Sequence, residues 1–212
     1  MDPLLMGQGG ESPKLILADG MELVCSAVDV VRGSLKLNGA SLRVEDRVEL
    51  LQSTEEAETA GAPGVRIGTL HGPGTIRRLQ DSCDPVDAFD PVLVNRGRIR
   101  LDGVIDVQGD FEQVGGILRV QRRVGDNIGL ESRIDIDGRA ALAGSVVFDI
   151  QPSAWDPPVG STFTILNASE GFEPDRDAFE FSVTQWYGDP RFFICSTVEN
   201  VGGTGSSIVA TV

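Results

Sequence analysis

Residues 97–116, with the sequence GRIRLDGVIDVQGDFEQVGG, carry the clearest structural signal in the chain. Apolar and polar residues alternate in this stretch, as at Ile99 and Leu101 and again at Ile105 and Val107. A period of two indicates short β-strands with one buried face. Glycines recur at every sixth residue, at positions 97, 103, 109 and 115. The stretch therefore predicts a regular succession of strand, corner and strand.

The same signal recurs elsewhere in the chain. Residues 35–39 (LKLNG), 99–103 (IRLDG) and 134–138 (IDIDG) share one pattern: apolar, charged, apolar, Asn or Asp, and Gly. Glycine adopts positive φ freely and Asn or Asp tolerates it, so each unit predicts a strand that ends in a sharp corner. Repeats of this kind indicate a repetitive all-β architecture.

Three all-β architectures use such corners. In an antiparallel β-sandwich the Asn-Gly and Asp-Gly pairs are hairpin turns. In a right-handed parallel β-helix, or β-solenoid, they are corners of a coil, and each strand stacks on its equivalent one turn away. A left-handed helix of hexapeptide repeats needs one bulky aliphatic residue per six, whereas the hexads here hold two. Strands of four or five residues favour the right-handed β-solenoid, with the sandwich as the alternative.

Composition and charge argue against several classes of protein. The 212 residues are 41% hydrophobic, enough to bury one sizeable core. The 32 acidic and 18 basic residues give a net charge of −14, which repels nucleic acid. No apolar run reaches the roughly 20 residues of a membrane span, so we expect no membrane insertion. The cysteines, Cys25, Cys83 and Cys195, are odd in number and widely spaced, and they predict buried free thiols.

Three segments are expected along the chain. Residues 1–13 are Gly-rich and polar, lack the features of a secretory signal, and predict a flexible lead-in. Residues 14–154 hold the repeats and predict the β-solenoid, interrupted by loops at 52–64 and 80–92. Residues 155–212 hold both tryptophans, the one tyrosine and six of the nine phenylalanines. We expect this last segment to be an aromatic-rich β unit that caps the final turn.

Part of the chain resembles a known family. The stretches 103–109, 111–120, 140–146 (with A-x-L-x-G) and 160–166 (G-x-x-F-x-I-L) are similar to the C-terminal repeats of large bacterial surface proteins of the autotransporter-adhesin type. The resemblance spans about residues 97–172 and implies a parallel β-helix that is exported and structural or adhesive. It also implies an extracellular or cell-surface location.

Catalytic signatures are absent from the sequence. It contains no G-x-S-x-G, P-loop or H-E-x-x-H motif. The one histidine, His71, lies in the segment LHGPG, which predicts a solvated turn. A Ser-His-Asp triad would depend on that single residue, so we expect no catalytic site.

Carboxylates are the most plentiful functional groups. Asp102, Asp106 and Asp110 recur at every fourth residue, and Asp135 and Asp137 share a strand face. Stacked strands could bring these oxygens within reach of one calcium ion, the only cofactor the sequence suggests. The other interpretation is a solvated face on which they pair with arginines. The arginines that could also supply positive charge to a uronate substrate are Arg98, Arg100, Arg119, Arg122 and Arg123.

Aromatic residues offer a second kind of binding site. Trp155, Trp186 and Tyr187 are candidates for stacking on sugar rings, with packing in the core of the capping unit as the alternative. The sequence as a whole predicts a non-enzymatic structural or adhesive segment of a bacterial cell-surface or secreted protein. Its partners would be surface carbohydrate or a host cell-surface protein. The alternatives are a carbohydrate-active β-helix enzyme, of lyase or hydrolase type, and a sugar-binding module.

Overall fold

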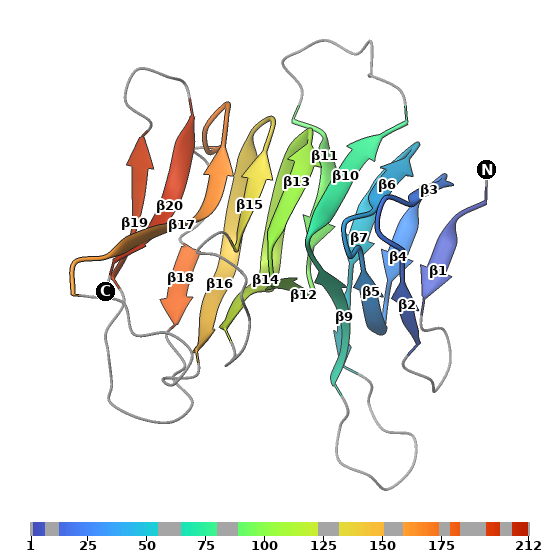
Figure 1. Ribbon diagram of the computed structural model, residues 1–212, viewed down its shortest axis with the longest axis horizontal. Helices are drawn as coiled ribbons and strands as arrows, with labels where there is room; N and C mark the ends of the chain where they lie inside the picture. Colours follow the sequence, from blue (N-terminus) through green and yellow to red (C-terminus); the bar gives the residue numbers. More distant parts are fainter. Residues whose placement is uncertain are drawn as a thin grey trace, which may run out of the picture.

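All regular structure in the described part of the chain is β-strand, as expected (Figure 1). The computed structural model describes residues 2–6, 13–54, 65–79, 89–122, 132–150, 159–173, 179–182, 194–199 and 205–211. Within these ranges there is no helix long and apolar enough to cross a membrane. The strands are β1 (Leu4–Met6), β2 (Lys14–Ile16), β3 (Glu22–Cys25), β4 (Val28–Val30), β5 (Gly33–Lys36), β6 (Ser41–Val44), β7 (Val48–Leu50), β8 (Gln52–Thr54), β9 (Val65–His71), β10 (Gly74–Arg78), β11 (Pro91–Asn95), β12 (Arg98–Leu101), β13 (Val104–Gln108), β14 (Asp110–Arg122), β15 (Arg133–Ile136), β16 (Ala140–Ile150), β17 (Thr162–Ala168), β18 (Phe179–Ser182), β19 (Ile194–Glu199) and β20 (Ser206–Thr211).

The strands form a 12-stranded and an 8-stranded sheet, both mainly parallel. Of the described pairs, only β8 with β9, β17 with β20 and β19 with β20 are antiparallel. The sheets curl, and the sequence advances along the long axis from the N-terminal to the C-terminal strands (Figure 1). The antiparallel sandwich is therefore wrong as an alternative. Strands β5 and β6, which flank the Asn-Gly corner, pair with strands of different sheets and not with each other.

The strands recur in groups of three, here called triplets. The first strands of successive triplets pair along β1, β4, β7, β11 and the first half of β14. The second strands pair along β2, β5, β9, β12 and the second half of β14. The third strands pair along β3, β6, β10, β13, β15 and β17. Strand β16 repeats the arrangement of β14, because it pairs with β14 over both halves.

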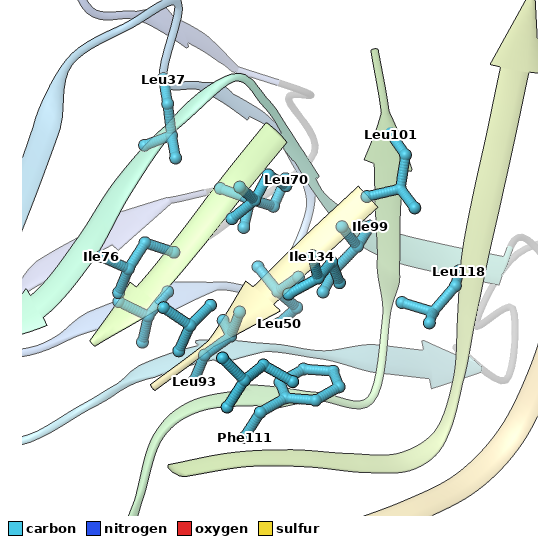
Figure 2. Packing of buried hydrophobic residues seen from close by; sticks show 14 of the residues in the cluster. Leu37, Leu50, Leu70, Ile76, Leu93, Ile99, Leu101, Phe111, Leu118 and Ile134 are labelled. Atoms are coloured by element: carbon cyan, nitrogen blue, oxygen red, sulfur yellow. The ribbon is translucent and has the colours of Figure 1, made fainter. Parts of the chain in front are cut away.

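Side chains that face the interior form aliphatic columns across the strands (Figure 2). In the second strands of the triplets, one column consists of Leu35, Leu70, Ile99 and Leu118. In the third strands, another consists of Leu23, Leu42, Ile76, Val107, Ile136 and Ala168. All of these except Leu23 are buried. Complete burial of one such Leu, Ile or Val side chain contributes about 1.5–3 kcal/mol, so the columns are the main source of stability.

The predicted corners are present, and they are of two kinds. LKLNG and IRLDG lie between the second and third strands of their triplets, before β6 and β13, whereas IDIDG lies between β15 and the next triplet. At the first of these corners Asn38 has a φ of 52° and Gly39 a φ of 85°. The similar repeats therefore mark corners in general and do not identify one position in the triplet.

A column of glycines lies where the first strand of each triplet passes to the second. Gly33 pairs with Gly68, and Gly116 pairs with Gly144. A Cβ on Gly116 would lie 2.5 Å from the carbonyl oxygen of Asn95, and one on Gly144 would lie 2.5 Å from that of Gly116. Gly97 belongs to the same column, because a Cβ on it would overlap the carbonyl oxygen of Gly68. The backbones of neighbouring triplets approach here too closely for any side chain.

A buried amide pair lies beside the glycine column. Asn95 and Gln113 are neighbours in register and are both fully buried. The Asn95 Nδ2 donates a hydrogen bond of 2.8 Å to the Gln113 Oε1, and the Gln113 Nε2 donates one of 2.7 Å to the Gly116 carbonyl. Leucines occupy the adjacent positions of this column, at Leu50 and Leu142. The amide pair thus satisfies its own polar groups inside an otherwise apolar column, apart from the Asn95 Oδ1.

Several expected boundaries differ from the structure. Strand β1 falls inside the expected lead-in 1–13 and pairs with β4. Strand β8 falls inside the expected loop 52–64 and pairs with β9. The 8-stranded sheet continues past residue 155, because β17 pairs with β15. Cys25 is free and buried as predicted, and burial raises the pKa of its thiol. Cys83 and the side chain of Cys195 lie outside the described residues.

Replacing a glycine of the column should cost far more than replacing a glycine that has open space. We expect Gly116→Ala to lower the free energy of unfolding by about 3 kcal/mol, because the new methyl group overlaps the Asn95 backbone. Gly20→Ala meets no atom within 4 Å and should cost about 1 kcal/mol, from its φ of 71° alone. Urea unfolding measures both, and equal losses would contradict the close approach.

Candidate functional site

Two of the candidate carboxylates lie side by side on the outer face of the 8-stranded sheet. Asp106 of β13 pairs in register with Asp135 of β15. The Gln108 Nε2 donates a hydrogen bond of 3.1 Å to Asp106, and the Arg133 Nε lies 2.9 Å from each carboxylate oxygen of Asp135. Each carboxylate is therefore engaged by a side chain two residues away on its own strand.

The other three carboxylates lie at corners or at the start of a strand. Asp102 follows β12, Asp137 follows β15 and is exposed, and Asp110 begins β14. Among the described residues, no group of three or more His, Cys, Asp or Glu side chains is placed to hold a metal ion. Of the five calcium candidates, the structure brings Asp106 and Asp135 together and leaves the others apart from them.

The carboxylate of Asp110 accepts hydrogen bonds from the backbone of two neighbouring triplets. Its Oδ1 accepts a hydrogen bond of 2.8 Å from the backbone N–H of Arg139, and its Oδ2 accepts one of 3.0 Å from that of Asp90. Arg139 also lies 3.6 Å from Asp110 and 2.7 Å from Glu173, and its guanidinium is 5.6 Å from the centroid of the Phe89 ring. Asp90 precedes β11 and Arg139 precedes β16. Asp110 thus ties together the entries to the first strands of three successive triplets.

Trp155, Trp186 and Tyr187 lie outside the described residues, as do Arg123 and the side chain of Arg122. The remaining candidate arginines, Arg98, Arg100 and Arg119, lie on β12 and β14 of the 12-stranded sheet. Asp106 and Asp135 lie on the other sheet. Asp106 and Asp135 therefore lie apart from these arginines, whereas Asp102 directly follows β12, the strand of Arg98 and Arg100.

The arginines instead join a row of basic side chains that sequence reasoning did not assemble. Residues 36, 71, 100 and 119 align across β5, β9, β12 and β14, and residues 14 and 98 occupy the neighbouring outward positions of β2 and β12. The basic row, as defined here, consists of Lys14, Lys36, His71, Arg98, Arg100 and Arg119. The outward positions in register beside these residues hold Ile16, Ser34, Thr69 and Ile117, and Asp102 directly follows β12.

The basic row contains both lysines of the sequence and its one histidine. His71 is the last residue of β9 and is half-buried, so the expectation of a solvated turn histidine is wrong. Its neighbours in LHGPG form the corner, while His71 itself still pairs within the sheet. The sequence did contain a signal for this placement: Leu70 is apolar and His71 polar, and this alternation predicts that His71 occupies an outward position of a strand.

Positive charge dominates the electrostatics of the basic row. Burial, followed by Arg100, Lys36, Lys14 and Arg98, lowers the pKa of His71 to about 4. Burial and then Arg119 lower the pKa of Arg98. Among the described residues, no carboxylate forms an ion pair with Lys14, Lys36 or Arg98, whereas Arg100 and Arg119 interact with further groups. At neutral pH the row is a neutral imidazole surrounded by cations.

Removing the Asp110 carboxylate should destabilise the fold. We expect Asp110→Ala to lower the free energy of unfolding by about 2 kcal/mol, because the partly buried backbone N–H of Arg139 and the exposed one of Asp90 both lose a charged acceptor. The matched control Asp137→Ala removes the same charge from an exposed corner and should change stability by no more than about 0.5 kcal/mol. Urea denaturation measures the free energy of unfolding of both variants. Similar losses in the two would argue against a stabilising role of the Asp110 hydrogen bonds.

The pH dependence of stability should carry the signature of His71. The unfolded chain takes up a proton at its ordinary pKa of 6.5, whereas the folded chain resists protonation until about pH 4. The stability contributed by neutral His71 is therefore complete above pH 6.5 and is lost as the pH falls toward 4. Compared with His71→Gln, the wild type should lose Tm over this range. A difference in Tm between the two that stays constant from pH 7 to pH 4 would refute the shift.

Comparison with known proteins gives this chain no relative: no family model, no curated protein and no solved structure matches it. Its function must therefore be inferred from the register of its strands and from the charges that this register brings together. On the 8-stranded sheet this register brings opposite charges together, whereas across β5, β9, β12 and β14 it aligns Lys36, His71, Arg100 and Arg119.

Proposed function

We propose that this chain is a right-handed parallel β-solenoid that acts as a non-enzymatic structural or adhesive segment of a bacterial cell-surface or secreted protein. One observation carries the proposal: equivalent residues stay aligned through six successive third strands, from Leu23 in β3 to Ala168 in β17. Each triplet of strands would form one turn of the coil. Such stacking makes every turn a neighbour of only the next and the previous turn.

Rigid display would be the mechanism of this segment. Inter-strand hydrogen bonds and aliphatic columns run along the axis of the coil, so they resist bending and stretching together. The expected loops at 52–64 and 80–92 would present contact surface. Strands β20 and β19 add to β17 in antiparallel fashion, so the direction of pairing changes at that end of the sheet. This change supports the proposal that residues 155–212 form a capping unit.

The family resemblance supports the same proposal. The stretches 103–109, 111–120 and 140–146 contain or overlap strands β13, β14 and β16, and 160–166 overlaps β17. The matching residues are thus strand residues of a parallel stack, as the autotransporter-adhesin resemblance implies. An extracellular or cell-surface location follows from the same resemblance. The separation of Asp106 and Asp135 from the arginines of the other sheet favours a scaffold over a lyase.

Pulling the chain from its ends should release the turns one after another. In single-molecule force experiments with handles at residues 2 and 211, we expect several unfolding events. The turn from Val28 to Val48, a span of 20 residues, should lengthen the chain by about 70 Å. Asp137→Ala should leave the forces unchanged, whereas Gly116→Ala should lower the force of the event that includes its turn.

Two outcomes would contradict the proposal. One is a single event that releases the whole chain, because it would show a core that is not divided into turns. The other is catalysis: cleavage of polygalacturonate or alginate by the wild type that is lost in Asp102→Asn or Asp106→Asn. The release of reducing ends measures such cleavage, and we expect none above the protein-free control.

A further inference from the structure

The first triplet, β1 to β3, gathers exposed apolar side chains. Leu5 of β1 is 46% exposed, Ile16 of β2 is 53% exposed, and Met21, just before β3, is 43% exposed. Together with Val159 they are the exposed large hydrophobic residues of the described part of the chain. The three strands lie at the N-terminal end of the long axis (Figure 1). A single exposed apolar residue is ordinary, but three at one end of a fold indicate a contact surface.

Each strand of the first triplet is also the edge of a sheet. Strands β1 and β2 are the two ends of the strand order in the 12-stranded sheet, and β3 is one end of the 8-stranded sheet. Among the described strands, β1 pairs only with β4, β2 only with β5, and β3 only with β6. The other edge of each strand presents backbone N–H and C=O groups that can pair with a further strand.

The aliphatic columns end at the same face. Leu15 is partly buried, whereas Leu35, its partner in β5, has no exposed surface. The same contrast holds for the first and third strands, at Leu4 against Val28 and at Leu23 against Leu42. A partner on this face would therefore have to supply both strand edges and aliphatic side chains.

We propose that the first triplets of two copies of this chain meet end to end, with β2 of one copy pairing antiparallel to β2 of the other about a two-fold axis at Leu15. The inference requires only the pairing of the described strands, so it does not depend on the adhesive function proposed above. A two-fold contact uses the same surface on both copies and closes on itself. It therefore gives a dimer and not a fibre.

The backbone of β2 has its free groups at defined positions. The Ser34 N–H donates a hydrogen bond of 3.0 Å to the Pro13 carbonyl, and the Leu17 N–H donates one of 2.9 Å to the Lys36 carbonyl. Alternate residues of a parallel strand bond to the same neighbour, so residues 13, 15 and 17 face β5. The N–H and C=O groups of residues 14 and 16 therefore point toward the open edge.

These free groups are complementary to those of a second copy. With Leu15 opposite Leu15 of the second copy, Lys14 of each copy lies opposite Ile16 of the other. Residues that lie opposite each other with their free groups facing exchange two hydrogen bonds in an antiparallel pair. The two pairs of Lys14 and Ile16 would thus form four hydrogen bonds, which use every edge-facing group of these residues.

The side chains fit the same register. Contact between the two Leu15 side chains continues the aliphatic column of the second strands through the two-fold axis. On the outer face, the aliphatic stem of Lys14 would cover the exposed Ile16 of the other copy while its ammonium group stays in water. No two like charges lie directly opposite each other in this pairing.

A single strand from another protein fits this face less well. It would pair with one edge and leave the other two edges, with their exposed apolar residues, in water. A second copy supplies three edges and three ends of aliphatic columns at once. For this reason the proposal commits to a second copy.

Sedimentation of the full-length protein tests for the dimer. We expect a species of twice the monomer mass with a Kd of about 1–100 μM, because a face of three short strands is small for a specific interface. Added salt should strengthen the association, because each copy carries a net charge of −14 and the contact is apolar. A protein that stays monomeric up to about ten times the upper end of this range would overturn the proposal.

A charge placed on the face should separate the copies. Ile16→Lys puts two ammonium groups opposite each other in each pair and should weaken association by about tenfold or more. The matched control Val159→Lys adds the same charge at a valine that is 90% exposed outside the first triplet, and it should change the Kd by less than about threefold. Equal effects would overturn the proposal. If Ile16→Lys does not fold, Leu5→Lys provides the same comparison.

A disulfide tests the register. Residues 15 of the two copies would form a pair without hydrogen bonds, with Cα atoms about 4.5 Å apart, a distance that a disulfide spans. Under mild oxidation Leu15→Cys should give a covalent dimer on a non-reducing gel. Leu5→Cys, on β1 and away from the axis, should give no more than the wild type with its own three cysteines. Equal cross-linking of the two variants, or none in Leu15→Cys, would overturn the pairing about Leu15. The force experiment on single chains is unaffected by either result.

Discussion

Parallel pairing of each strand with its equivalent in the next triplet is the constraint on which the rest of the structure depends. Because side chains alternate between the two faces of a strand, a shift of one residue would turn every buried leucine of a column outward. The glycine column holds this register at one corner. A Cβ on Gly116 would lie 2.5 Å from the Asn95 carbonyl oxygen, so the triplets reach their spacing only with glycine there. The amides of Asn95 and Gln113 fasten the same corner from the inside.

Register also decides which charged residues meet. Asp106 meets Asp135, and Lys36 meets His71 and then Arg100, although these residues are far apart in the sequence. On the 8-stranded sheet opposite charges pair, within a strand as Arg133 with Asp135 and between strands as Arg43 with Glu22. On the 12-stranded sheet the aligned outward positions of β5, β9, β12 and β14 hold Lys36, His71, Arg100 and Arg119. The two faces of one scaffold therefore have different chemistry, although the same aliphatic columns support both.

Alternation in the sequence was sufficient to predict the strands and their inward residues: Ile99, Leu101, Ile105 and Val107 are all fully buried. The Asn-Gly corner was also predictable, because Asn38 and Gly39 both need positive φ. The pairing between triplets was not predictable from the sequence, because the insertions before β9 and before β11 change the number of residues from one triplet to the next. The four-residue spacing of Asp102, Asp106 and Asp110 wrongly suggested that their carboxylates lie close together. A corner follows Asp102 and another precedes Asp110, so residues four apart do not share a face. His71 was misplaced because its flanking Gly72 and Pro73 dominate the local signal.

The division between inward and outward positions explains how such a scaffold can acquire a binding surface. Replacing an outward residue leaves the aliphatic columns intact, so charge on the outer face can change at little cost to the fold. A single exposed ion pair contributes only about 0.2–1 kcal/mol, too little to hold a partner. A row that repeats once per triplet adds such contacts along a ligand of the same periodicity, and the ligand gives up its freedom of movement only once. Recognition by a stacked fold therefore depends on the number of aligned strands more than on any one residue, and for this reason the register that stabilises the core would also determine the affinity.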